Sequence, residues 1–524
     1  MMKQLNKQFT APISKAMEAY AGDGALAFHT PGHKQGLGAH PLLKHLITEA
    51  GLRQEVSLME ELDDLHEPAG CIKEAQELAA ELWGARESLF VINGTTGAIQ
   101  AMIAGCLSPG DKVLVPRNAH RSIMGGIILA GAVPIYIQPE IDTKLGIAMG
   151  LSVAAVKQAI KAHPEAKALI AVYPTYYGFC CDLGRIADLV HRAGMLLLVD
   201  EAHGAHLRFG KDLPKQAIEL GADVVAQSTH KLLGSMTQTS MLHMGSDRVK
   251  AERIRQTASL LQSTSPNQLL LASLDIARLQ MAQEGAQRVD RAVALAQWLR
   301  QRINEIPGLY CPGKEVWEDS QLLAGGQEIS NDSMGAVALD WTKITVNLAG
   351  LSISGQEAEL LLRHQWKVQC ELSDPRNLLF IISMADTQRE ADRLLQVLQE
   401  LAGKYQKPVE IKSLQQRETG SAKESVSQVE AKPANMAEMP VAIQRINPRQ
   451  AFFASVRTVA LEEAVGCIGA ETIAFYPPGI PVLCPGEEIT KELVAYIRYY
   501  QGQGMRISGA VDSALQRIRI CQEE

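Results

Sequence analysis

The chain has 524 residues, of which 46% are hydrophobic and 21% charged, and its formal net charge is −7. These values are typical of a globular protein with about two to four domains and argue against nucleic acid or an anionic membrane surface as the main partner. Nine cysteines without a CxxC pair fit a reducing compartment better than a disulfide framework. No run of about 18 apolar residues occurs and Met1 to Ala21 lacks an apolar signal core, so we expect a cytoplasmic protein without membrane spans.

Residues 1–65 are expected to form an N-terminal segment with a helix at Ile13 to Tyr20 and a rigid loop around Pro31-Gly32. The loop carries His29 and His33, a spacing that would suit a metal site on one helical face. Because Pro-Gly breaks such a helix, metal binding is the less favoured interpretation. The loop also lacks the glycine and lysine spacing of a phosphate-binding P-loop.

Residues 66–314 alternate between helical periodicity and short apolar stretches. Leu196 to Val199 is apolar at every position, as expected of a strand that is covered on both faces. Such alternation predicts an α/β fold with a mostly parallel sheet between two layers of helices. The expected strands are Ser88–Ile92, Val113–Val115, Pro134–Ile137, Ala168–Val172, Met195–Val199, Asp223–Ala226 and Ser240–Met244. The expected helices are Cys71–Leu82, Thr96–Cys106, Ser122–Ala130, Ser152–Ala162 and Leu183–Ala193.

A long helix is predicted to open at Ser265-Pro266, with Pro266 in its first turn, and to end at Pro307-Gly308. It is expected to connect the large domain to a smaller α+β domain at residues 315–405. The predicted elements of that domain are strands at Ala336–Leu339, Ile344–Val346 and Leu378–Ile382 and helices at Gly355–Gln365 and Thr387–Leu401. The composition of residues 406–439 is typical of a solvated linker, and residues 440–524 are expected to form a C-terminal module.

The tetrapeptide Ser228-Thr229-His230-Lys231 lies between two apolar runs, right after an expected strand. Burial destabilises an ammonium ion and lowers its pKa, so Lys231 could serve as a nucleophilic amine. Amines of this kind form Schiff bases, above all with pyridoxal 5′-phosphate. On the tetrapeptide alone, a surface lysine after a strand is the more common interpretation.

A second motif, Asn93-Gly94-Thr95-Thr96-Gly97, follows another expected strand and begins a helix. A helix N-terminus with close backbone approach at glycine and two threonine hydroxyls is an anion site, and phosphate is its natural occupant. An ordinary helix cap is the alternative. No GxGxxG motif is present, so the sequence gives no direct indication of a dinucleotide fold.

Further polar residues follow expected strands, where ligands of open α/β sheets bind. Asp200 ends the most apolar strand, and a carboxylate there would keep a pyridine nitrogen protonated, which strengthens the ring as an electron sink. His120 could lie flat on an aromatic cofactor or cap the next helix. His203 and His206 allow a metal cluster as an alternative, although no nearby Cys or Glu completes a convincing ligand spacing.

In chain order, a phosphate-type helix start, a histidine, a strand-end aspartate and Ser-x-His-Lys resemble the layout of fold type I pyridoxal-phosphate enzymes. More closely, the chain resembles the bacterial Orn/Lys/Arg decarboxylase family. The resemblance covers nearly the whole chain and rests on His29-Thr30-Pro31-Gly32-His33-Lys34, Ser228-Thr229-His230-Lys231 and Tyr476-Pro477-Pro478-Gly479-Ile480-Pro481. Within that family, the chain is similar to the shorter, Bacillus-type arginine decarboxylases.

The resemblance implies pyridoxal 5′-phosphate as the cofactor, a basic L-amino acid as the substrate and a homodimer or higher homo-oligomer. Lys231 would bind the cofactor, Asp200 would pair with its pyridine nitrogen and His120 would stack on its ring. His203 belongs to the same catalytic group with an open role, because the family often has a larger aromatic residue there. The implied phosphate-binding residues are Gly94, Thr95, Thr96, Ser228 and His230.

Arginine, converted to agmatine for polyamine biosynthesis, is the substrate that the whole-chain resemblance favours, with lysine and ornithine as alternatives. A dibasic substrate needs an acidic or carbonyl-lined distal pocket, for which Glu471 and Glu487 in the C-terminal module are candidates. The resemblance also implies that the loop from His29 to Lys34 reaches the partner's site. Three rival functions stay open: an aminotransferase that binds the α-carboxylate through Arg376, a non-catalytic regulator that keeps the fold, and a zinc hydrolase.

Overall fold

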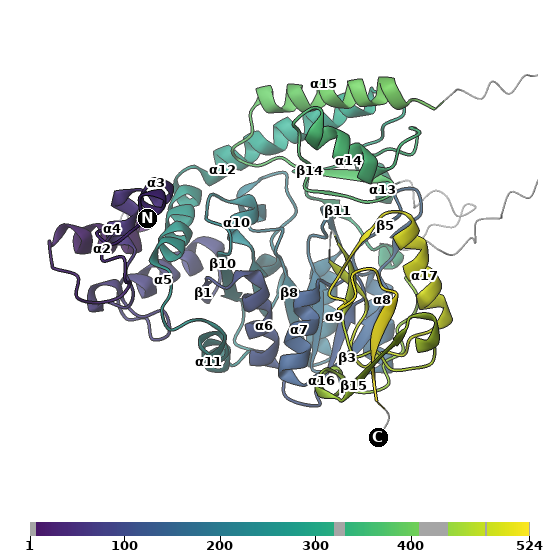
Figure 1. Ribbon diagram of the computed structural model, residues 1–524, viewed down its shortest axis with the longest axis horizontal. Helices are drawn as coiled ribbons and strands as arrows, with labels where there is room; N and C mark the ends of the chain where they lie inside the picture. Colours follow the sequence, from purple (N-terminus) through teal and green to yellow (C-terminus); the bar gives the residue numbers. More distant parts are fainter. Residues whose placement is uncertain (1–6, 319–330, 408–438, 477–478, 523–524) are drawn as a thin grey trace, which may run out of the picture.

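The computed structural model describes residues 7–318, 331–407, 439–476 and 479–522 (Figure 1). Most of the expected linker and Pro477-Pro478 of the C-terminal motif lie outside this part of the chain. Figure 1 shows the large sheet and its helices in the middle and the N-terminal helices at the left. A small unit with α14 (Gly355–His364) and α15 (Gln388–Tyr405) lies at the top, and a C-terminal unit with α17 (Lys491–Gly502) lies at the right.

A seven-stranded sheet forms the centre of the molecule, in the order β1-β10-β9-β8-β6-β2-β3. All neighbouring strands run parallel except at the two edges of β10, so the predicted mostly parallel sheet is confirmed. Every one of these strands begins within one residue of its predicted start. The strands are β1 (Glu87–Val91), β2 (Lys112–Pro116), β3 (Val133–Ile137), β6 (Ala168–Val172), β8 (Leu196–Asp200), β9 (Val224–Gln227) and β10 (Ser240–Met244).

Helices cover both faces of this sheet because successive strand residues point to opposite sides. Leu198 packs into the core of one helical layer, whereas Leu197 and Val199 pack into the core of the other. The first layer consists of α6 (Gly94–Cys106), α7 (Arg121–Ala130) and α11 (Ala251–Leu261), and the second of α8 (Val153–Ala162) and α9 (Leu183–Arg192). These apolar layers fix the strand ends, and therefore the polar residues that follow the strands, relative to one another.

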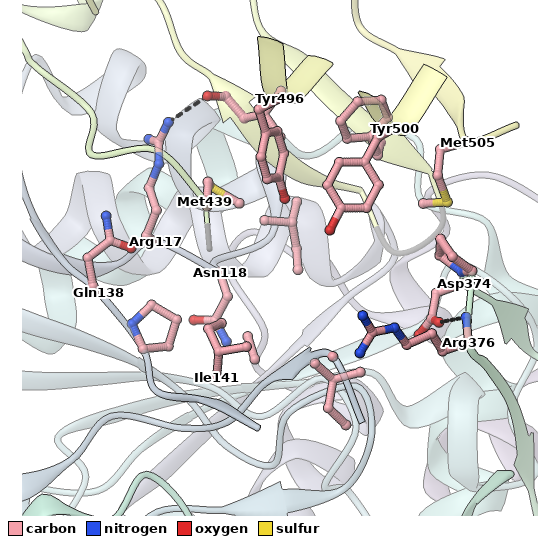
Figure 2. Close-up of a pocket in the computed structure, with 18 of the residues that line it drawn as sticks. Arg117, Asn118, Gln138, Ile141, Asp374, Arg376, Met439, Tyr496, Tyr500 and Met505 are labelled. Atoms are coloured by element: carbon pink, nitrogen blue, oxygen red, sulfur yellow. Dashed lines mark hydrogen bonds between the residues drawn. The ribbon is translucent and has the colours of Figure 1, made fainter. Parts of the chain in front are cut away.

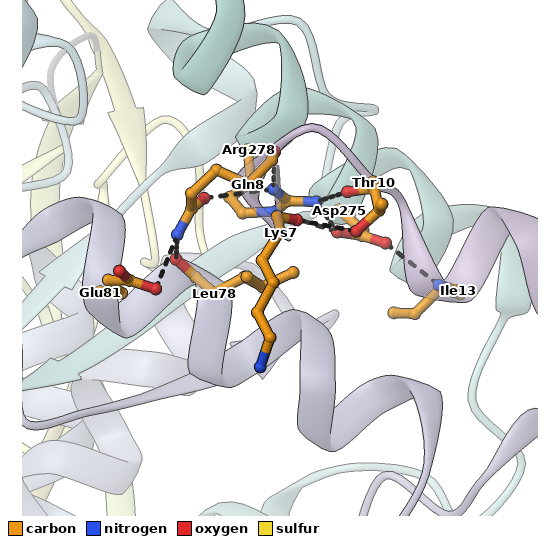
Figure 3. Close-up of polar contacts among 8 residues, drawn as sticks. All are labelled: Lys7, Gln8, Thr10, Ile13, Leu78, Glu81, Asp275 and Arg278. Atoms are coloured by element: carbon orange, nitrogen blue, oxygen red, sulfur yellow. Dashed lines mark hydrogen bonds and ion pairs between the residues drawn. The ribbon is translucent and has the colours of Figure 1, made fainter. Parts of the chain in front are cut away.

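The N-terminal segment packs against the large unit through a core that includes Ile13, Trp83 and Leu271. Arg278 donates hydrogen bonds to the backbone carbonyls of Gln8 and Thr10 and so holds the beginning of the segment (Figure 3). The elements of this region are α2 (Pro12–Gly22), α3 (Pro41–Ile47), α4 (Glu49–Gln54), η1 (Glu60–Leu62), α5 (Cys71–Trp83) and the long helix α12 (Gln268–Asn304).

Helix α12 runs without interruption over 37 residues. It begins after Asn267, whose side chain accepts a hydrogen bond from the N–H of Leu270 at 3.0 Å. The prediction that Pro266 lies in the first turn is therefore wrong, because Asn267 provides the cap. The first half of α12 packs with the N-terminal segment, and its second half, with Leu299 and Ile303, packs into the core of the small unit.

The small unit contains a three-stranded sheet in the order β12-β14-β13, which packs against α14 and α15. Its strands are β12 (Lys343–Asn347), β13 (Leu372–Ser373) and β14 (Asn377–Ile381). The predicted strand from Ala336 to Leu339 is reduced to β11 (Ala338–Leu339), which pairs with β7 (Phe179–Cys180) of the large unit instead. The segment between β11 and β12 consequently carries residues of the small unit toward the strand ends of the large sheet.

The remaining elements before the C-terminal unit are short. They are β4 (Ile141–Asp142), β5 (Ile147–Ala148), η2 (Leu207–Phe209), η3 (Ala217–Leu220), α10 (Thr229–Leu232), α13 (Glu315–Glu318) and η5 (Asn331–Ser333). Among the described residues, no helix combines the length and hydropathy that a membrane crossing requires.

The C-terminal unit has its own apolar core, which includes Leu461, Phe475, Leu483 and Ile518. One sheet has the order β17-β16-β18, and β15 pairs separately with β19. The elements are α16 (Pro448–Phe453), β15 (Val456–Ala460), η6 (Glu462–Ala464), β16 (Ile473–Tyr476), β17 (Ile480–Leu483), α17, β18 (Arg506–Ser508) and β19 (Arg517–Cys521). Asn447 attaches the unit to the end of α7 by donating to the carbonyls of Gly131 and Ala132.

Candidate active site

Lys231 lies in the short helix α10, directly after β9, where a ligand of an open α/β sheet is expected. Its Nζ is 2.9 Å from Nε2 of His203 and 5.5 Å from the centre of the Tyr176 ring. Burial lowers the pKa of the Lys231 ammonium group, while Asp200 and Glu371 act in the opposite direction. A half-buried amine with a lowered pKa has the properties that a nucleophile needs, and the role of Lys231 as that nucleophile stays a prediction.

Asp200 ends β8, which lies beside β9 in the sheet, and its side chain is buried. One carboxylate oxygen accepts the N–H of Ala202 at 3.1 Å. Burial raises the pKa of the carboxyl group, and the positive charge of Lys231 works against that rise. A buried carboxylate within electrostatic reach of the reactive amine is suited to pair with a protonated ring nitrogen.

His203 contacts both Lys231 and Tyr176. Its ring centroid is 4.5 Å from that of Tyr176. Burial lowers the pKa of His203 well below its ordinary value, and Lys231 and Lys343 lower it further. The imidazole is therefore neutral, and it can accept a proton from an ammonium group or donate one to an amine at hydrogen-bond distance.

The residues predicted to bind phosphate lie together where α6 begins next to α10. The Oγ1 of Thr95 is 2.5 Å from Oγ of Ser228 and 3.0 Å from Oγ of Ser240, so the two motifs are in direct contact. The N–H of Gly94 donates to the carbonyl of Gln238 at 2.8 Å, and Asn93 does not cap α6 with its side chain, which leaves the N–H groups of Thr95 and Thr96 for another acceptor. Gly94 has φ +67°, and a Cβ added there would meet no atom within 4 Å.

The other predicted cofactor residues surround this site. Thr96 is exposed at the start of α6. His230 is held by its Nδ1, which donates to the carbonyl of Thr239 at 2.7 Å. Burial, reinforced by Lys231 and Arg121, lowers the pKa of His120 to about 4, so its ring is uncharged. His120 also caps α7, since its Nδ1 accepts the N–H of Ser122 at 3.2 Å.

These residues fit pyridoxal 5′-phosphate. The open space beside Gly94 and the uncapped start of α6 suit a phosphate group. The Lys231 amine suits the aldehyde, and the buried Asp200 suits the ring nitrogen. His120 keeps its predicted stacking role as a prediction, because the contacts place it near Lys231 without fixing the orientation of its ring toward a cofactor.

Two acidic residues that we expected to bind the distal group of the substrate have other partners. Glu487 forms a buried ion pair with Arg117, with N–O distances of 2.6 and 2.9 Å, so the expectation for Glu487 is wrong. The two oxygens of Glu471 accept backbone N–H groups of Val511 and Arg519. Glu471 therefore orders a loop of the C-terminal unit instead of facing a substrate.

Two other predicted features lie apart from the described contacts of Lys231. Arg376, the residue that an aminotransferase would need, is exposed and donates to the carbonyl of Thr143 at 3.1 Å. The N-terminal loop has its own partners: His29 is 2.9 Å from the hydroxyl of Tyr20, and His33 forms a 2.8 Å contact with Glu55. Within one copy of the chain, this loop does not contribute to the Lys231 site.

Two features near Lys231 were not predicted from the sequence. Tyr176 follows β6, and the rule that ligands bind beyond strand ends could have identified it. Lys343, Asp340 and His206 form a buried polar cluster that only the pairing of β11 with β7 brings to the site. Among the described residues, no group of three or more His, Cys, Asp or Glu side chains is arranged to hold a metal ion.

A separate cavity of about 790 Å³ lies where the large, small and C-terminal units meet. Figure 2 shows Tyr496 and Tyr500 of α17 facing Asn118 and Ile141 across this cavity, with Arg376 on a further side. Lys231 and Asp200 do not line it. The cavity is thus bordered by residues 117 and 118, just before His120, but is distinct from the Lys231 site.

Together, the sheet order, the helix start at Gly94 and the strand-end pair of Asp200 and Lys231 define a pyridoxal-phosphate-dependent enzyme of fold type I. Comparison with known proteins identifies the family within this class. The Orn/Lys/Arg decarboxylase family matches residues 11–390 with its major domain and residues 432–510 with its C-terminal domain. The chain belongs to the Orn/Lys/Arg decarboxylase family, and it is a decarboxylase with pyridoxal phosphate as its cofactor.

Relatives of known name agree with this assignment. The arginine decarboxylase of Bacillus subtilis is 40% identical over 517 residues, which cover 99% of each chain. The arginine decarboxylase of Halalkalibacterium halodurans is 39% identical over 522 residues, again 99% of each chain. Lysine decarboxylase LdcA of Pseudomonas aeruginosa is 27% identical over 573 residues, which cover 93% of this chain and 75% of that protein.

Solved structures support the fold. The lysine decarboxylase LdcF of Francisella novicida superposes with a TM-score of 0.80 at 22% identity, covering 98% of this chain and 82% of that chain. The constitutive lysine decarboxylase of Escherichia coli gives a TM-score of 0.75 at 21% identity over the same shares. The predicted fold type I architecture is therefore confirmed.

Proposed function

We propose that this chain decarboxylates L-arginine to agmatine and so serves polyamine biosynthesis in the cytoplasm. The observation that carries the choice of arginine is the similarity in sequence. Three relatives named arginine decarboxylase are 39–40% identical to this chain. Each of these matches covers at least 98% of this chain and at least 98% of the relative. Relatives named lysine decarboxylase are 24–27% identical, which leaves lysine and ornithine as alternatives to be tested.

In this proposal, Lys231 would hold the cofactor through its side-chain amine. Its lowered pKa supports this role, because an uncharged amine is needed at neutral pH. Bound pyridoxal phosphate supplies an electron sink for the electron pair that remains on Cα when CO2 leaves. Asp200 stabilises that sink by holding a proton on the ring nitrogen, and His120 covers the ring as an uncharged surface.

The phosphate is held, in the same proposal, by the first turn of α6 and by α10. Gly94, Thr95 and Thr96 supply the start of a helix, where N–H groups and the helix dipole favour an anion. Ser228 is already in hydrogen-bond contact with Thr95, and the Nε2 of His230 points away from its Thr239 contact. This arrangement would set the distance between the phosphate and Lys231.

A homodimer or higher homo-oligomer is part of the proposal. Large apolar side chains of the N-terminal segment are strongly exposed in the single chain, with exposed fractions of 73–91%: Leu26, Phe28, Leu37, Leu42 and Leu46. Such a patch is typical of a surface that another polypeptide covers. A second copy of the chain is the partner that fits, since the loop from His29 to Lys34 lies on the same segment.

The domain division also remains part of the proposal. We divide the chain into an N-terminal segment to residue 65, a cofactor-binding domain at 66–314, a small domain at 315–405, a linker at 406–439 and a C-terminal domain at 440–524. The separate apolar cores of the small and C-terminal units support this division. The continuous helix α12 contributes to the core of the small domain as well as to that of the cofactor-binding domain, so the boundary between these two domains is a shared element rather than a hinge.

The test is to incubate the purified protein and pyridoxal phosphate separately with L-arginine, L-lysine and L-ornithine and to measure CO2 and the amine product. We expect agmatine, with kcat/KM for arginine at least about tenfold above the others, a difference of about 1.4 kcal/mol in transition-state binding. Cadaverine or putrescine as the main product would select an alternative substrate. Formation of a 2-oxo acid without CO2 would show an aminotransferase, and Lys231→Ala should abolish both cofactor absorbance and activity.

A further inference from the structure

A buried polar cluster lies within electrostatic reach of His203 and Lys231 and is unused by the roles given above. It combines His206, on the loop after β8, with Asp340, on the segment between β11 and β12, and Lys343, the first residue of β12. The exposed fractions are 2% for His206, 0% for Asp340 and 1% for Lys343. Large and small units thus both contribute charged or titratable groups to one solvent-excluded place.

Asp340 is the centre of this cluster. Its Oδ1 is 3.1 Å from Nε2 of His206 and accepts the hydroxyl of Thr342 at 2.7 Å. Its Oδ2 lies 3.8 Å from Nζ of Lys343. Burial by itself would raise the pKa of Asp340, but His206 and Lys343 outweigh it and lower the pKa, so the carboxylate is ionised. Because a carboxylate only accepts, the Nε2 of His206 carries the proton that it donates to Asp340.

Four buried atoms around the cluster have no hydrogen-bond partner within the part of the chain that the structure describes: Nδ1 of His203, Nδ1 of His206, Oδ2 of Asp340 and Nζ of Lys343. Buried polar atoms are normally paired, and exceptions concentrate at functional sites. Nζ of Lys343 and Nδ1 of His203 can donate a hydrogen bond. Oδ2 of Asp340 and Nδ1 of His206, whose proton is on Nε2, can accept one. Bridging water molecules would complete this set, and such chains conduct protons.

The reaction needs a proton at this place, an argument that rests on the proposed decarboxylation. When CO2 leaves, the bond between Cα and the carboxylate carbon breaks and its electron pair stays with the substrate. A new C–H bond then forms at Cα. The balance is one amino acid plus one proton giving one amine plus CO2. Each turnover therefore draws one proton from solvent into a site from which water is largely excluded.

We propose that His203 returns this proton toward Cα and that Lys343, Asp340 and His206 recharge His203 from the solvent side. His203 touches the reacting amine of Lys231 and is a catalytic residue in this scheme. The other three act through His203 and are positioning residues.

The charges around the two ends of this path agree with proton transfer. The groups that face His203 are Lys231, Lys343, His120 and His206. Those that face Lys343 are Asp340, Lys231, Glu371 and Cys180. Burial lowers the pKa of Lys343, with a further contribution from Lys231, so this lysine can release a proton more readily than a surface lysine.

The test measures whether the proton is added to Cα of the substrate or to the cofactor. Wild-type holoenzyme and the variants His203→Gln, Lys343→Met and Asp340→Asn are given the amino acid that the wild type decarboxylates fastest. Protonation of Cα yields the amine, whereas protonation on the cofactor yields an aldehyde together with pyridoxamine phosphate. We expect the aldehyde fraction to rise about tenfold in each variant, and kcat to fall about 10²-fold in His203→Gln, at the lower end for general acids.

A second readout needs no turnover. The rate at which the cofactor-free enzyme takes up pyridoxal phosphate depends on the uncharged fraction of Lys231, so its pH profile reports on that amine. We expect the midpoint of this profile to move in all three variants. The control is His243→Gln, which removes another buried histidine, hydrogen-bonded to Ser88 and Gln227. It should change thermal stability only and leave both readouts at the wild-type values.

The possible results distinguish a failure of the proposed proton path from a failure of the proposed decarboxylation. An unchanged aldehyde fraction in Lys343→Met and Asp340→Asn overturns the proposal, whatever happens to stability. If one of these variants does not fold, the other decides, because the two remove opposite charges from the same pair. If the wild type decarboxylates no amino acid, the proposed function fails, and an unchanged pH profile of cofactor uptake then overturns the link from the cluster to Lys231 as well.

Discussion

Two buried arginines attach the two ends of the chain to the large unit, and they do so in different ways. Arg278 is neutralised within its own helix, because Asp275, three residues before it, accepts from its guanidinium at 2.7 Å. Arg117 is neutralised by Glu487, which is 370 residues further along the chain and belongs to the C-terminal unit. Both pairs are inaccessible to solvent, with side-chain exposed fractions of 0% for the first and 2% for the second.

The difference determines what each attachment costs to break. If the N-terminal segment leaves, Arg278 loses only the carbonyl acceptors of Gln8 and Thr10 and keeps its carboxylate. If the C-terminal unit leaves, Arg117 loses Glu487 and the carbonyl of Val482 together, and the buried ion pair is broken. The attachment of the C-terminal unit therefore includes a charge pair between distant segments, whereas loss of the N-terminal contacts leaves the charge pair of Arg278 intact.

The largest effect is expected for Glu487→Gln. This change leaves the Arg117 guanidinium buried and unpaired, and we expect a loss of about 3–5 kcal/mol in the free energy of unfolding. Urea denaturation measures it. The matched control is Glu488→Gln, the next residue, which pairs with Arg445 on the surface and should cost about 0–1 kcal/mol. Equal losses for the two variants would refute the distinction.

The next largest effect of Glu487→Gln is expected on the pKa of His120, which lies three residues after Arg117. Burial holds the pKa of His120 at about 4. The unfolded chain therefore binds this proton at a higher pH than the folded chain, and the stability that the neutral ring contributes is lost as the pH falls from about 6.5 through 4. In Glu487→Gln, a loosened loop should raise the pKa of His120 by about one unit or more.

Nuclear magnetic resonance of labelled histidine, with His120→Gln to assign the signal, measures that pKa. Asp275→Asn serves as the matched control, since the contacts of Arg278 lie within α12 and the N-terminal segment and the change should leave the His120 signal unchanged. A rise of the same size in both variants would mean that general loosening, and not the C-terminal attachment, controls this loop.

Asp275→Asn itself should cost about 1.5–3 kcal/mol, the range for hydrogen bonds to charged groups, because Arg278 still reaches three acceptors on Gln8 and Thr10. Asp275 also accepts the N–H of Ile13 at 3.1 Å, so the same change should expose the start of α2 to proteases. Limited proteolysis and urea denaturation together measure both effects. A loss in the free energy of unfolding as large as that of Glu487→Gln would contradict the proposed difference between the attachments through Arg278 and Arg117.

The smallest effect is expected for Gln8→Ala. The amide of Gln8 donates to the carbonyl of Leu78 at 3.0 Å and its oxygen faces Arg278 at 3.3 Å. Loss of these contacts should cost about 1 kcal/mol and leave decarboxylation unchanged, as judged by CO2 release. A large loss of activity would show that the N-terminal segment matters to the site within one copy of the chain.

Local sequence patterns were sufficient to predict the strands of the large sheet. The strand from Leu196 to Asp200 is apolar except at its end, and both the buried strand and its terminal carboxylate follow from that pattern. Ser152, the first residue of an expected helix, caps α8, with its Oγ accepting the N–H of Ala155 at 3.3 Å. Such features depend on residues close in the chain, and periodicity and cap chemistry report them directly.

Contacts between distant segments were beyond those patterns. Glu487 was expected to face a substrate and instead neutralises Arg117, because nothing near either residue in the sequence reveals the other. The expected strand at Ala336–Leu339 is mostly irregular, and its last two residues pair with β7, since a short strand follows whichever edge is available. The contact between His203 and Lys231 was also not predicted, although both residues were.

By itself, the sequence determined the class of fold and the cofactor, and it predicted the lysine that would bind this cofactor, because each depends on short motifs placed after buried strands. Only the tertiary structure decided what surrounds that lysine. The pairing of β11 with β7 brings Asp340 and Lys343 beside the loop that carries His203 and His206. Burial then shifts the pKa values of these groups, and burial is a property of the packed chain that no residue possesses alone.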